Sequence, residues 1–235
     1  MVEINNEKVI KIPDKNERLA EFVGIMLGDG NITKYKSKIN NNCDYSICIA
    51  GNYEKDFDYL TVYVSNLIIE LFNTKPPFYR QKNTNGMKIY VRSKRLVLFL
   101  ESIGLVPGHK KRNNVKIPDW IFSKKEFMTA CLRGLIDTDG CVCPLPKKDY
   151  PCIWFKSAIP NLRESFDKLV SELGIIMTNW TIKKNTPQIY IYRKEMVIKY
   201  IQEIGFSNLK HKQKLNKFDL ESFKNNRLSN SSVLL

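Results

Sequence analysis

The sequence lacks the features of several large classes of protein. No apolar run reaches the length of a membrane span, and the N-terminal Met-Val-Glu-Ile-Asn-Asn-Glu has the character of neither a secretory signal nor an Arg-rich transit peptide. The six cysteines include no C-x-x-C pair, and the two histidines lie far from them in the chain, so we do not expect a structural zinc site. These absences favour an intracellular protein with reduced thiols and no membrane partner.

Acidic residues are scarce relative to basic ones. The chain has 24 Asp and Glu against 38 Lys and Arg, which gives a net charge of +14 spread along its length. Such a field favours a polyanionic partner, and nucleic acid fits better than an anionic membrane because no long basic amphipathic helix stands out. With 235 residues and 43% hydrophobic content, the chain is large enough for one large core or two small ones.

Two stretches, Leu132–Gly140 and Phe22–Gly30, share an unusual ending. Each places apolar residues at helical spacing and finishes with Asp-Gly, and the glycine suits the left-handed position after a helix end. Asp29 and Asp139 then fall on the last helical turn, where the partial negative charge of a helix C-terminus makes an acid unfavourable. We therefore expect a divalent cation beside these two carboxylates.

Both stretches also carry a glycine inside the apolar helix, Gly24 and Gly134. Glycine costs about 1 kcal/mol in a helix interior, so a compensating interaction is expected. Close approach of two helix backbones would provide it. The sequence therefore predicts that the two helices pack against each other at these glycines.

The two halves of the chain repeat one order of elements at a spacing of about 100 residues, too long for a solenoid. After each Asp-Gly, the patterns predict a strand, a long helix, a hairpin and a closing helix. In the first half the strand lies at 45–49, the long helix at 56–72, the hairpin strands at 78–82 and 87–92, and the closing helix at 95–104. In the second half the same elements lie at 153–156, at 162–173, at 179–183 and 188–192, and at 195–205. A tandem duplication of the α+β class fits: a first half at 1–106, a linker at 107–125, a second half at 126–223 and a tail at 224–235.

Alternation in the predicted strands separates an apolar face from a polar one. A half-buried antiparallel sheet explains the apolar face, and a solvated surface is the simplest interpretation of any single polar residue. Two such faces in a strongly basic chain favour contact with DNA, because strands fit the major groove and their side chains read base edges. The candidate DNA-binding residues are Lys82, Lys88, Tyr90, Arg92, Lys183, Gln188, Tyr190, Tyr192 and Arg193, with His109 and His211 as phosphate contacts.

The two stretches carry a known signature. Leu132–Gly140 differs from LAGLIDADG only at Arg133 and Thr138, and Phe22–Gly30 is a more diverged copy with Leu27 in place of the first Asp. Two copies in one chain resemble the single-chain LAGLIDADG homing endonucleases. The resemblance implies two pseudo-symmetric halves (αββαββα-like), each with a four-stranded antiparallel sheet laid on DNA, packed through the two LAGLIDADG helices.

The resemblance also implies a metal site and a reaction. Asp29 and Asp139 would bind Mg²⁺ with help from the backbone carbonyls of Gly28 and Thr138. Mn²⁺ is expected to substitute, and Ca²⁺ to bind without supporting efficient cleavage. The implied activity is that of an intron-encoded enzyme, with hydrolysis of both strands of double-stranded DNA across the minor groove of a long, imperfectly palindromic site.

Further residues enter through the same resemblance. A lysine after the last hairpin strand is expected to support catalysis, which selects Lys94 and Lys194, with Arg92 and Arg193 as competitors. Asn52, which follows the first-half strand, is a candidate for positioning water and contacting DNA.

Other functions remain as alternatives. An RNA-binding maturase that assists intron splicing would use the same fold, but the retained acids Asp29 and Asp139 favour the nuclease without excluding both activities. A DNA-binding regulator would not need both acids, and an intein is not expected from the first and last residues of this sequence. We expect a monomer that acts inside the cell, with the host DNA.

Overall fold

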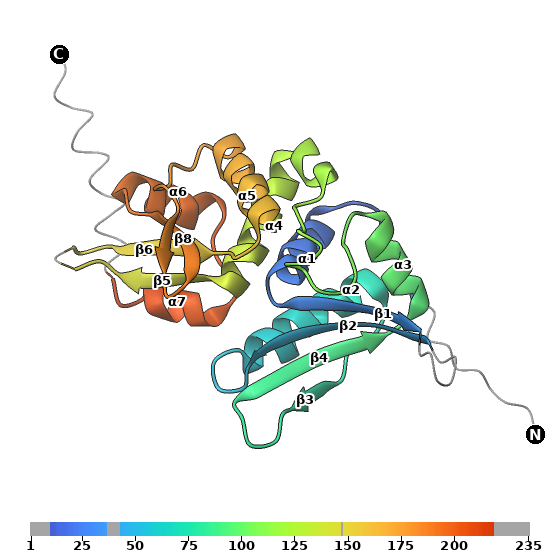
Figure 1. Cartoon of the computed structure of the whole chain (residues 1–235). Coiled ribbons are helices and arrows are strands. Elements are labelled where there is room, and N and C mark those ends of the chain that lie inside the picture. Colours follow the sequence, from blue (N-terminus) through green and yellow to red (C-terminus); the bar gives the residue numbers. More distant parts are fainter. Residues whose placement is uncertain (1–9, 37–42, 147, 219–235) are drawn as a thin grey trace, which may run out of the picture.

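Two four-stranded antiparallel sheets flank a central pair of helices in the computed structural model, which describes residues 10–36, 43–146 and 148–218 (Figure 1). The predicted α+β class and the predicted two halves are confirmed. The first half contains α1 (Glu17–Gly28), β1 (Gly30–Lys36), β2 (Cys43–Asn52), η1 (Tyr59–Val64), α2 (Ser65–Phe72), β3 (Phe78–Arg80), β4 (Gly86–Arg92) and α3 (Lys94–Ser102). The connection contains η2 (Asp119–Ser123).

The second half repeats this order and adds one helix. It contains α4 (Lys125–Asp139), β5 (Gly140–Pro144), β6 (Pro151–Lys156), α5 (Pro160–Glu172), β7 (Thr181–Lys183), β8 (Thr186–Ile191), α6 (Lys194–Glu203) and α7 (Leu209–Leu215). None of the helices within the described ranges is long and apolar enough to cross a bilayer. The predicted tail at 224–235 lies outside the described residues, as do residues 1–9.

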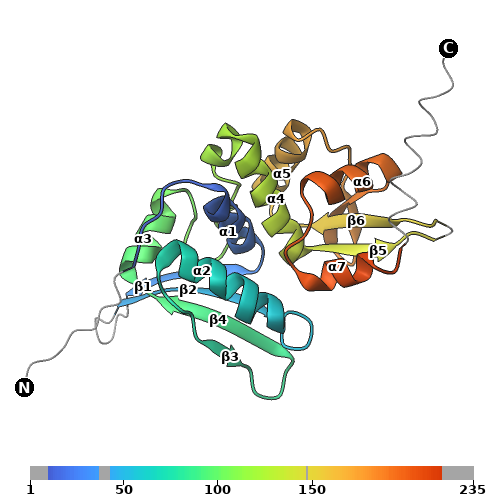
Figure 2. The same cartoon turned by 180° about the vertical axis from the view of Figure 1, so that it is seen from behind.

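The two sheets have matching strand orders, β1-β2-β4-β3 and β5-β6-β8-β7. Ile47 pairs with Val91 in the first sheet and Ile153 with Ile191 in the second, and all four side chains are buried. Figure 2 shows α2 and α3 covering one face of the first sheet. Because side chains alternate along a strand, one face of each sheet lines a core and the other carries the polar residues that the sequence predicted.

Some boundaries differ from the sequence prediction. The long helix predicted at 56–72 begins as the π-helical segment η1, and α7 was not predicted. The second hairpin turns on two residues, Lys184 and Asn185, whose φ angles are +49° and +61°. Two consecutive left-handed residues make the tight turn that matches strand twist, so Thr186 already pairs with Lys183 in the ladder.

The central helices α1 and α4 pack through Gly24 and Gly134, as predicted. A Cβ atom on Gly24 would clash with the carbonyl oxygen of Cys131, and one on Gly134 would clash with the carbonyl of Glu21 and lie 2.9 Å from the Ile25 nitrogen. These neighbours are backbone atoms, which cannot rotate away. Only glycine therefore allows the two helices to approach this closely.

A buried polar cluster also joins the two central helices. The fully buried Glu21 of α1 forms an ion pair with Arg133 of α4 at 3.1 Å and accepts hydrogen bonds of 2.6 Å from Tyr63 and Ser207. Arg133 also donates to the carbonyl of Ile204 at 3.0 Å. A buried carboxylate is tolerated when its oxygens are paired in this way. This role accounts for the arginine at one of the two positions where the motif departs from its signature.

Gly30 and Gly140 do not adopt the left-handed conformation that the sequence analysis predicted. Gly140 has φ −103° and extended backbone, and neither glycine is among the residues with positive φ. A strand begins immediately at each of them, so the chain folds back over the last turn of its own helix. A Cβ on Gly140 would lie 2.6 Å from the Ile136 carbonyl oxygen, and one on Gly30 2.5 Å from the Met26 Cα. Close approach, rather than positive φ, explains both residues.

Candidate active site

The C-terminal ends of α1 and α4 meet at Gly28 and Thr138. A Cβ atom on Gly28 would clash with the hydroxyl of Thr138. That hydroxyl donates a hydrogen bond to the carbonyl oxygen of Gly134 at 2.9 Å. Asp29 follows Gly28, and Asp139 follows Thr138, so the two carboxylates lie side by side and only partly exposed. The structure thus brings together all four residues that the sequence analysis assigned to a metal site.

The two carboxylates are poorly solvated, and the charge of Asp139 acts on Asp29. Burial, and then the charge of the neighbouring Asp139, raise the pKa of Asp29 to about 6 against the opposing effect of Lys210 and Lys110. Burial likewise raises the pKa of Asp139, which Lys110, Lys156 and Lys210 partly offset. Both acids therefore carry a cost when ionised, and a cation bound between them would remove it.

Lys110, from the connection after α3, lies beside both aspartates. Its Nζ donates to the carbonyl oxygen of Leu27 at 2.9 Å and to that of Gly28. Burial lowers the pKa of Lys110 to about 8, although the charges of Asp139 and Asp29 act in the opposite direction. The ammonium group thus offsets the partial negative charge at the C-terminal end of α1. It also forms a hydrogen bond with the Gly28 carbonyl, which the sequence analysis assigned as a metal ligand.

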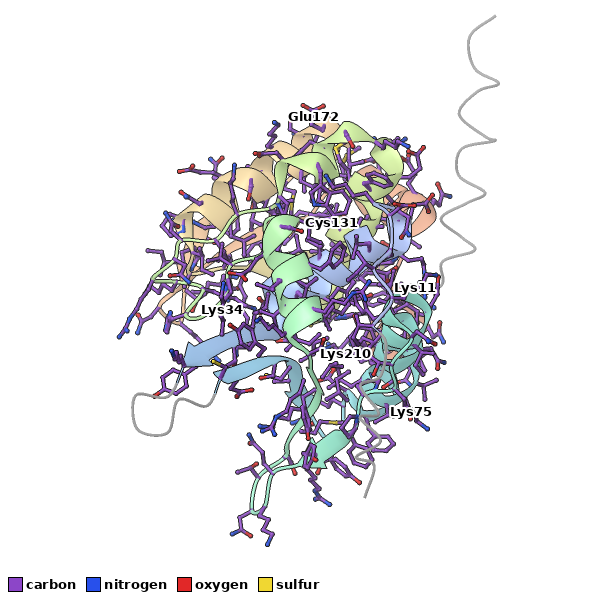
Figure 3. All side chains as sticks on the ribbon, turned by 90° about the vertical axis from the view of Figure 1, so that its right-hand side faces the viewer. Lys11, Lys34, Lys75, Cys131, Glu172 and Lys210 are labelled. Atoms are coloured by element: carbon purple, nitrogen blue, oxygen red, sulfur yellow. The ribbon has the colours of Figure 1, made fainter. Side chains whose placement is uncertain are left out.

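Lys210, from α7, approaches the same place from the second half. Its Nζ lies 2.8 Å from Oδ1 of Asp56, and Asp56 Oδ2 accepts a 2.9 Å hydrogen bond from the backbone N–H of Asn52. Burial would raise the pKa of Asp56, but the hydrogen bonds from Lys210 and from Asn52 lower it overall. In Figure 3, Lys210 is seen in the middle of the molecule beside the first half, where it joins the two halves.

A cleft of ≈ 420 Å³ opens at this cluster. Asp139, Lys110 and Lys156 line it, together with Asn31 and Thr186 at the adjoining ends of the two sheets. The cleft therefore places one of the two acids, two cations and strand residues of both halves around a common space.

The structure does not bring Lys94 and Lys194 to the aspartates. The ends of the sheets near Asp29 and Asp139 are marked by Lys88, opposite Ala50, and by Gln188, opposite Lys156. Lys94 and Lys194 each lie six residues beyond these positions, past the ends of β4 and β8 and at the starts of α3 and α6. Lys94 lies over the ring of Tyr45 and Lys194 pairs with Asp149, both at the far end of their sheets.

The candidate DNA-binding residues of the first half lie on the open face of its sheet. Lys88 and Arg92 are exposed and Tyr90 is partly exposed, and the residues between them are buried. Lys82 lies beyond the end of β3, in the hairpin tip, and not in a strand as predicted. The Asn52 side chain accepts two backbone N–H bonds of 3.1 Å from the turn that follows it, so its oxygen is engaged.

The corresponding face of the second half is more aromatic. Tyr190 is only 6% exposed, stacks on Tyr192 with ring centroids 5.0 Å apart, and donates to the side chain of Gln188 at 2.7 Å. Lys183 lies 4.5 Å above the Tyr190 ring. Arg193 is exposed at the start of α6. Of this set, Lys183, Tyr192 and Arg193 are therefore the most accessible to a partner.

His211 does not contact phosphate, contrary to the sequence prediction. Its side chain is fully buried, and burial lowers its pKa to about 3. The ring lies against the carbonyl of Asp137, whose carboxylate accepts a 2.8 Å hydrogen bond from the Ser207 N–H at the start of the α7 segment. His109, by contrast, is exposed and lines the cleft.

Four charged residues of the cluster were missed by sequence analysis: Lys156, Asp56 and the two lysines that follow the closing helices, Lys110 and Lys210. The repeated His-Lys segments after each closing helix mark the neighbourhood of the two lysines, but give no reason to place them at the acids. Asp56 carries no signal, because it is one acid at the start of a helical pattern.

Comparison with proteins of known sequence finds matching segments in much longer chains. The replication factor C small subunit of Methanocaldococcus jannaschii is 28% identical over 208 residues, 86% of this chain and 10% of that protein. The tRNA-splicing ligase RtcB of Methanopyrus kandleri is 25% identical over 209 residues, 80% of this chain and 20% of that protein. The chain spans between a tenth and a fifth of the length of these curated relatives, so their activities do not transfer to it.

Comparison with solved structures shows the fold. The crystal structure of I-DmoI with DNA and Mn has a TM-score of 0.58 at 19% identity, covering 81% of this chain and 97% of that one. I-DmoI has also been crystallised with DNA and Ca, and a variant of it with DNA in the presence of Mg. Residues 126–205 match the family described as LAGLIDADG-like domain. The second half of the chain therefore carries a LAGLIDADG-like domain, and the chain has the fold of the single-chain LAGLIDADG homing endonucleases.

Proposed function

We propose that this protein is a homing endonuclease that cuts both strands of double-stranded DNA, with divalent metal ions, across the minor groove of a long, imperfectly palindromic site. The observation that carries the proposal is the meeting of Asp29 and Asp139 at the helix ends between two basic sheets. A protein that only bound nucleic acid would gain nothing from two poorly solvated carboxylates facing a polyanion. Opposed acids at a pseudo-twofold axis suit the two strands of a duplex.

The residues present fit a Mg²⁺ ion. Carboxylates and carbonyls are the oxygen ligands that Mg²⁺ prefers, and proteins commonly hold it with one or two carboxylates while substrate phosphates supply the rest. Asp29 and Asp139 with the carbonyls of Gly28 and Thr138 form such a partial set, and within the described ranges no group of three or more acidic, histidine or cysteine side chains is arranged to hold a metal ion. The Gly28 carbonyl already accepts a hydrogen bond from the positively charged ammonium of Lys110, which supports its assignment as a ligand for a cation.

The metal would polarise the scissile phosphate and activate water. The lysines have a separate task. Lys110, Lys156 and Lys210 surround the acids with positive charge, which would hold the phosphates of the cleaved strands against the carboxylates. Because its pKa is lowered to about 8, Lys110 can also give or take a proton near neutral pH. We assign the catalytic lysine role to Lys110 rather than to Lys94 or Lys194.

One chain supplies both acids and both sheets, so we propose that a monomer binds the duplex. The halves differ in their outward residues, with Lys88 and Arg92 on one sheet and Tyr190 and Tyr192 on the other. Different reading surfaces require an imperfect palindrome, because a symmetric site would demand identical surfaces. The protein would work inside the cell, where that DNA is found.

The test is cleavage of a supercoiled plasmid that carries the sequence formed by joining the DNA on either side of the gene. With Mg²⁺ the wild-type protein should give linear product, and with a chelator none. Asp139→Asn should remove cleavage while DNA binding survives, because affinity comes from the basic sheets. Asp119→Asn, a matched change at an exposed acid paired with Lys116, should cleave normally. Linearisation by Asp139→Asn at the wild-type rate would contradict the proposal.

The same experiment addresses the maturase alternative. Tight binding of intron RNA by a protein that leaves the plasmid intact in Mg²⁺ and in Mn²⁺ would favour an RNA-binding function on this fold. Cleavage together with RNA binding would indicate that both activities coexist.

A further inference from the structure

Two cysteines face each other across the second sheet. Cys143 of β5 is paired directly with Cys152 of β6, and their Sγ atoms lie 3.1 Å apart. Opposed residues of an antiparallel pair have Cβ atoms about 4.5–5.5 Å apart, which is close to the spacing of a disulfide. A disulfide bond here requires the sulfur atoms to approach by about 1 Å, because the bond length is about 2.05 Å.

The pair lies on the open face of the sheet. Val142 and Ile153, adjacent to the two cysteines in their strands, are buried in the core, so the cysteines point to the other side. That side carries Tyr190 and Tyr192, and burial together with Cys152 raises the pKa of Tyr192. The thiols therefore sit among side chains that the proposed function places against DNA.

The two thiols differ in exposure and in pKa. Cys143 is partly exposed, and its pKa is lowered to about 7 because the Cys152 thiol donates a hydrogen bond to it, with Lys214 and Lys183 adding positive charge. Cys152 is 3% exposed, and the same hydrogen bond raises its pKa. Since the thiolate is the reactive form, Cys143 is the attacking sulfur and Cys152 the resolving one.

The neighbouring Cys141 does not turn the pair into a metal site. Its Sγ accepts a hydrogen bond from Lys214 Nζ at 2.9 Å, so an ammonium occupies its open side. Throughout the part of the chain that the structure describes, no group of three or more cysteine, histidine or acidic side chains is placed to hold a metal ion. With no metal site formed by the described residues here, two thiols at this distance are placed to form a disulfide bond.

We propose that Cys143 and Cys152 are a peroxide-reactive dithiol that forms a reversible disulfide in the free protein and that bound DNA protects. The Cys143 thiolate attacks one peroxide oxygen, which breaks the O–O bond, forms a sulfenic acid and releases hydroxide. Cys152 then attacks the sulfenyl sulfur, and the S–S bond forms as water leaves. The two thiols lose two electrons, which the peroxide gains, and a dithiol reductant reverses the reaction. Protection by DNA rests on the proposed function.

The test treats the full-length protein with hydrogen peroxide and maps disulfide-linked peptides by mass spectrometry without reduction. The expected product is a Cys143–Cys152 crosslink, lighter by two hydrogens and removed by dithiothreitol. Cys143→Ser and Cys152→Ser should each abolish it, and Cys141→Ser should retain it. Oxidation of Cys143 to sulfinic acid without this crosslink in the folded wild-type protein would overturn the proposal.

A second arm adds a mixed-sequence DNA duplex at low salt, where sequence-independent binding is strong. Crosslinking should be lost in proportion to the fraction of protein bound, and should return when high salt releases the DNA. An unchanged rate of crosslink formation in fully DNA-bound protein would contradict the proposed protection and would show that the second sheet is not part of the DNA-binding surface. It would not contradict the formation of the crosslink in the free protein. A missing crosslink would leave the DNA surface unaffected, so the two failures are distinguishable.

Discussion

Replacing Asp29 by Asn should make the metal-free protein more stable at neutral pH while it removes a metal ligand. Burial, with a further contribution from the charge of Asp139, raises the pKa of Asp29 to about 6. A raised pKa means that the folded protein holds the proton more tightly than the unfolded chain does. Ionisation at neutral pH therefore destabilises the fold, and asparagine keeps the shape without the charge.

The size and the pH dependence follow from the shift. From the ordinary value of 3.8 to about 6 is about two pKa units, which corresponds to an upper limit of roughly 3 kcal/mol. The penalty is absent below about pH 4, where the residue is protonated in both states, grows up to about pH 6 and stays constant above it. For a protein of this size, 1 kcal/mol moves the Tm by about 2–4 °C, so Asp29→Asn should gain several degrees at about pH 8.

The assay is thermal unfolding followed by circular dichroism, in a chelator, across this pH range. Asp56→Asn is the matched control with the opposite sign, because hydrogen bonds from Lys210 and Asn52 lower the pKa of Asp56 and its charge stabilises the fold. Asp56→Asn should lower the Tm at pH 8. A Tm gain for Asp29→Asn that is absent at pH 8, or equally large at pH 4, would refute the view that the acid is held at a cost for metal binding.

Three further predictions concern packing, catalysis and DNA binding. Gly134→Ala should lower the free energy of unfolding by about 1–3 kcal/mol or more, because the new Cβ would clash with a backbone carbonyl of α1 that cannot move. The measurement is a urea titration with Glu126→Ala, a change at an exposed residue, as the control. An unchanged unfolding midpoint for Gly134→Ala would contradict the close approach of the helices. Lys110→Gln should reduce plasmid cleavage far more than Lys94→Gln, and the reverse order of rates would restore the sequence-based assignment. Lys88→Ala should reduce the slope of log affinity against log salt by about one, without changing the Tm, if Lys88 contacts phosphate.

The sequence alone determined the repeated arrangement of the two halves, because local patterns carry it. Alternation in the segments around Ile47 and Ile189 defined strands with one buried face, and the structure places both residues in sheet cores. The interior glycines Gly24 and Gly134 predicted the helix contact, because a glycine inside an apolar helix needs a reason. The Asp-Gly endings located Asp29 and Asp139, because an acid on the last turn of a helix is locally unfavourable.

Only the tertiary structure decided which cations join those acids. Lys110 comes from a connecting segment and Lys210 from a helix that was not predicted, and both reach the acids through contacts with Gly28 and Asp56, which are distant in sequence. Nothing in the local sequence distinguishes Lys94 from other lysines. Its distance from the acids depends on strand direction and register, which no local pattern encodes. His211 shows the same limit: its burial follows from how α7 packs on Asp137. Periodicity determines which face of an element is buried, whereas long-range packing determines which charges meet.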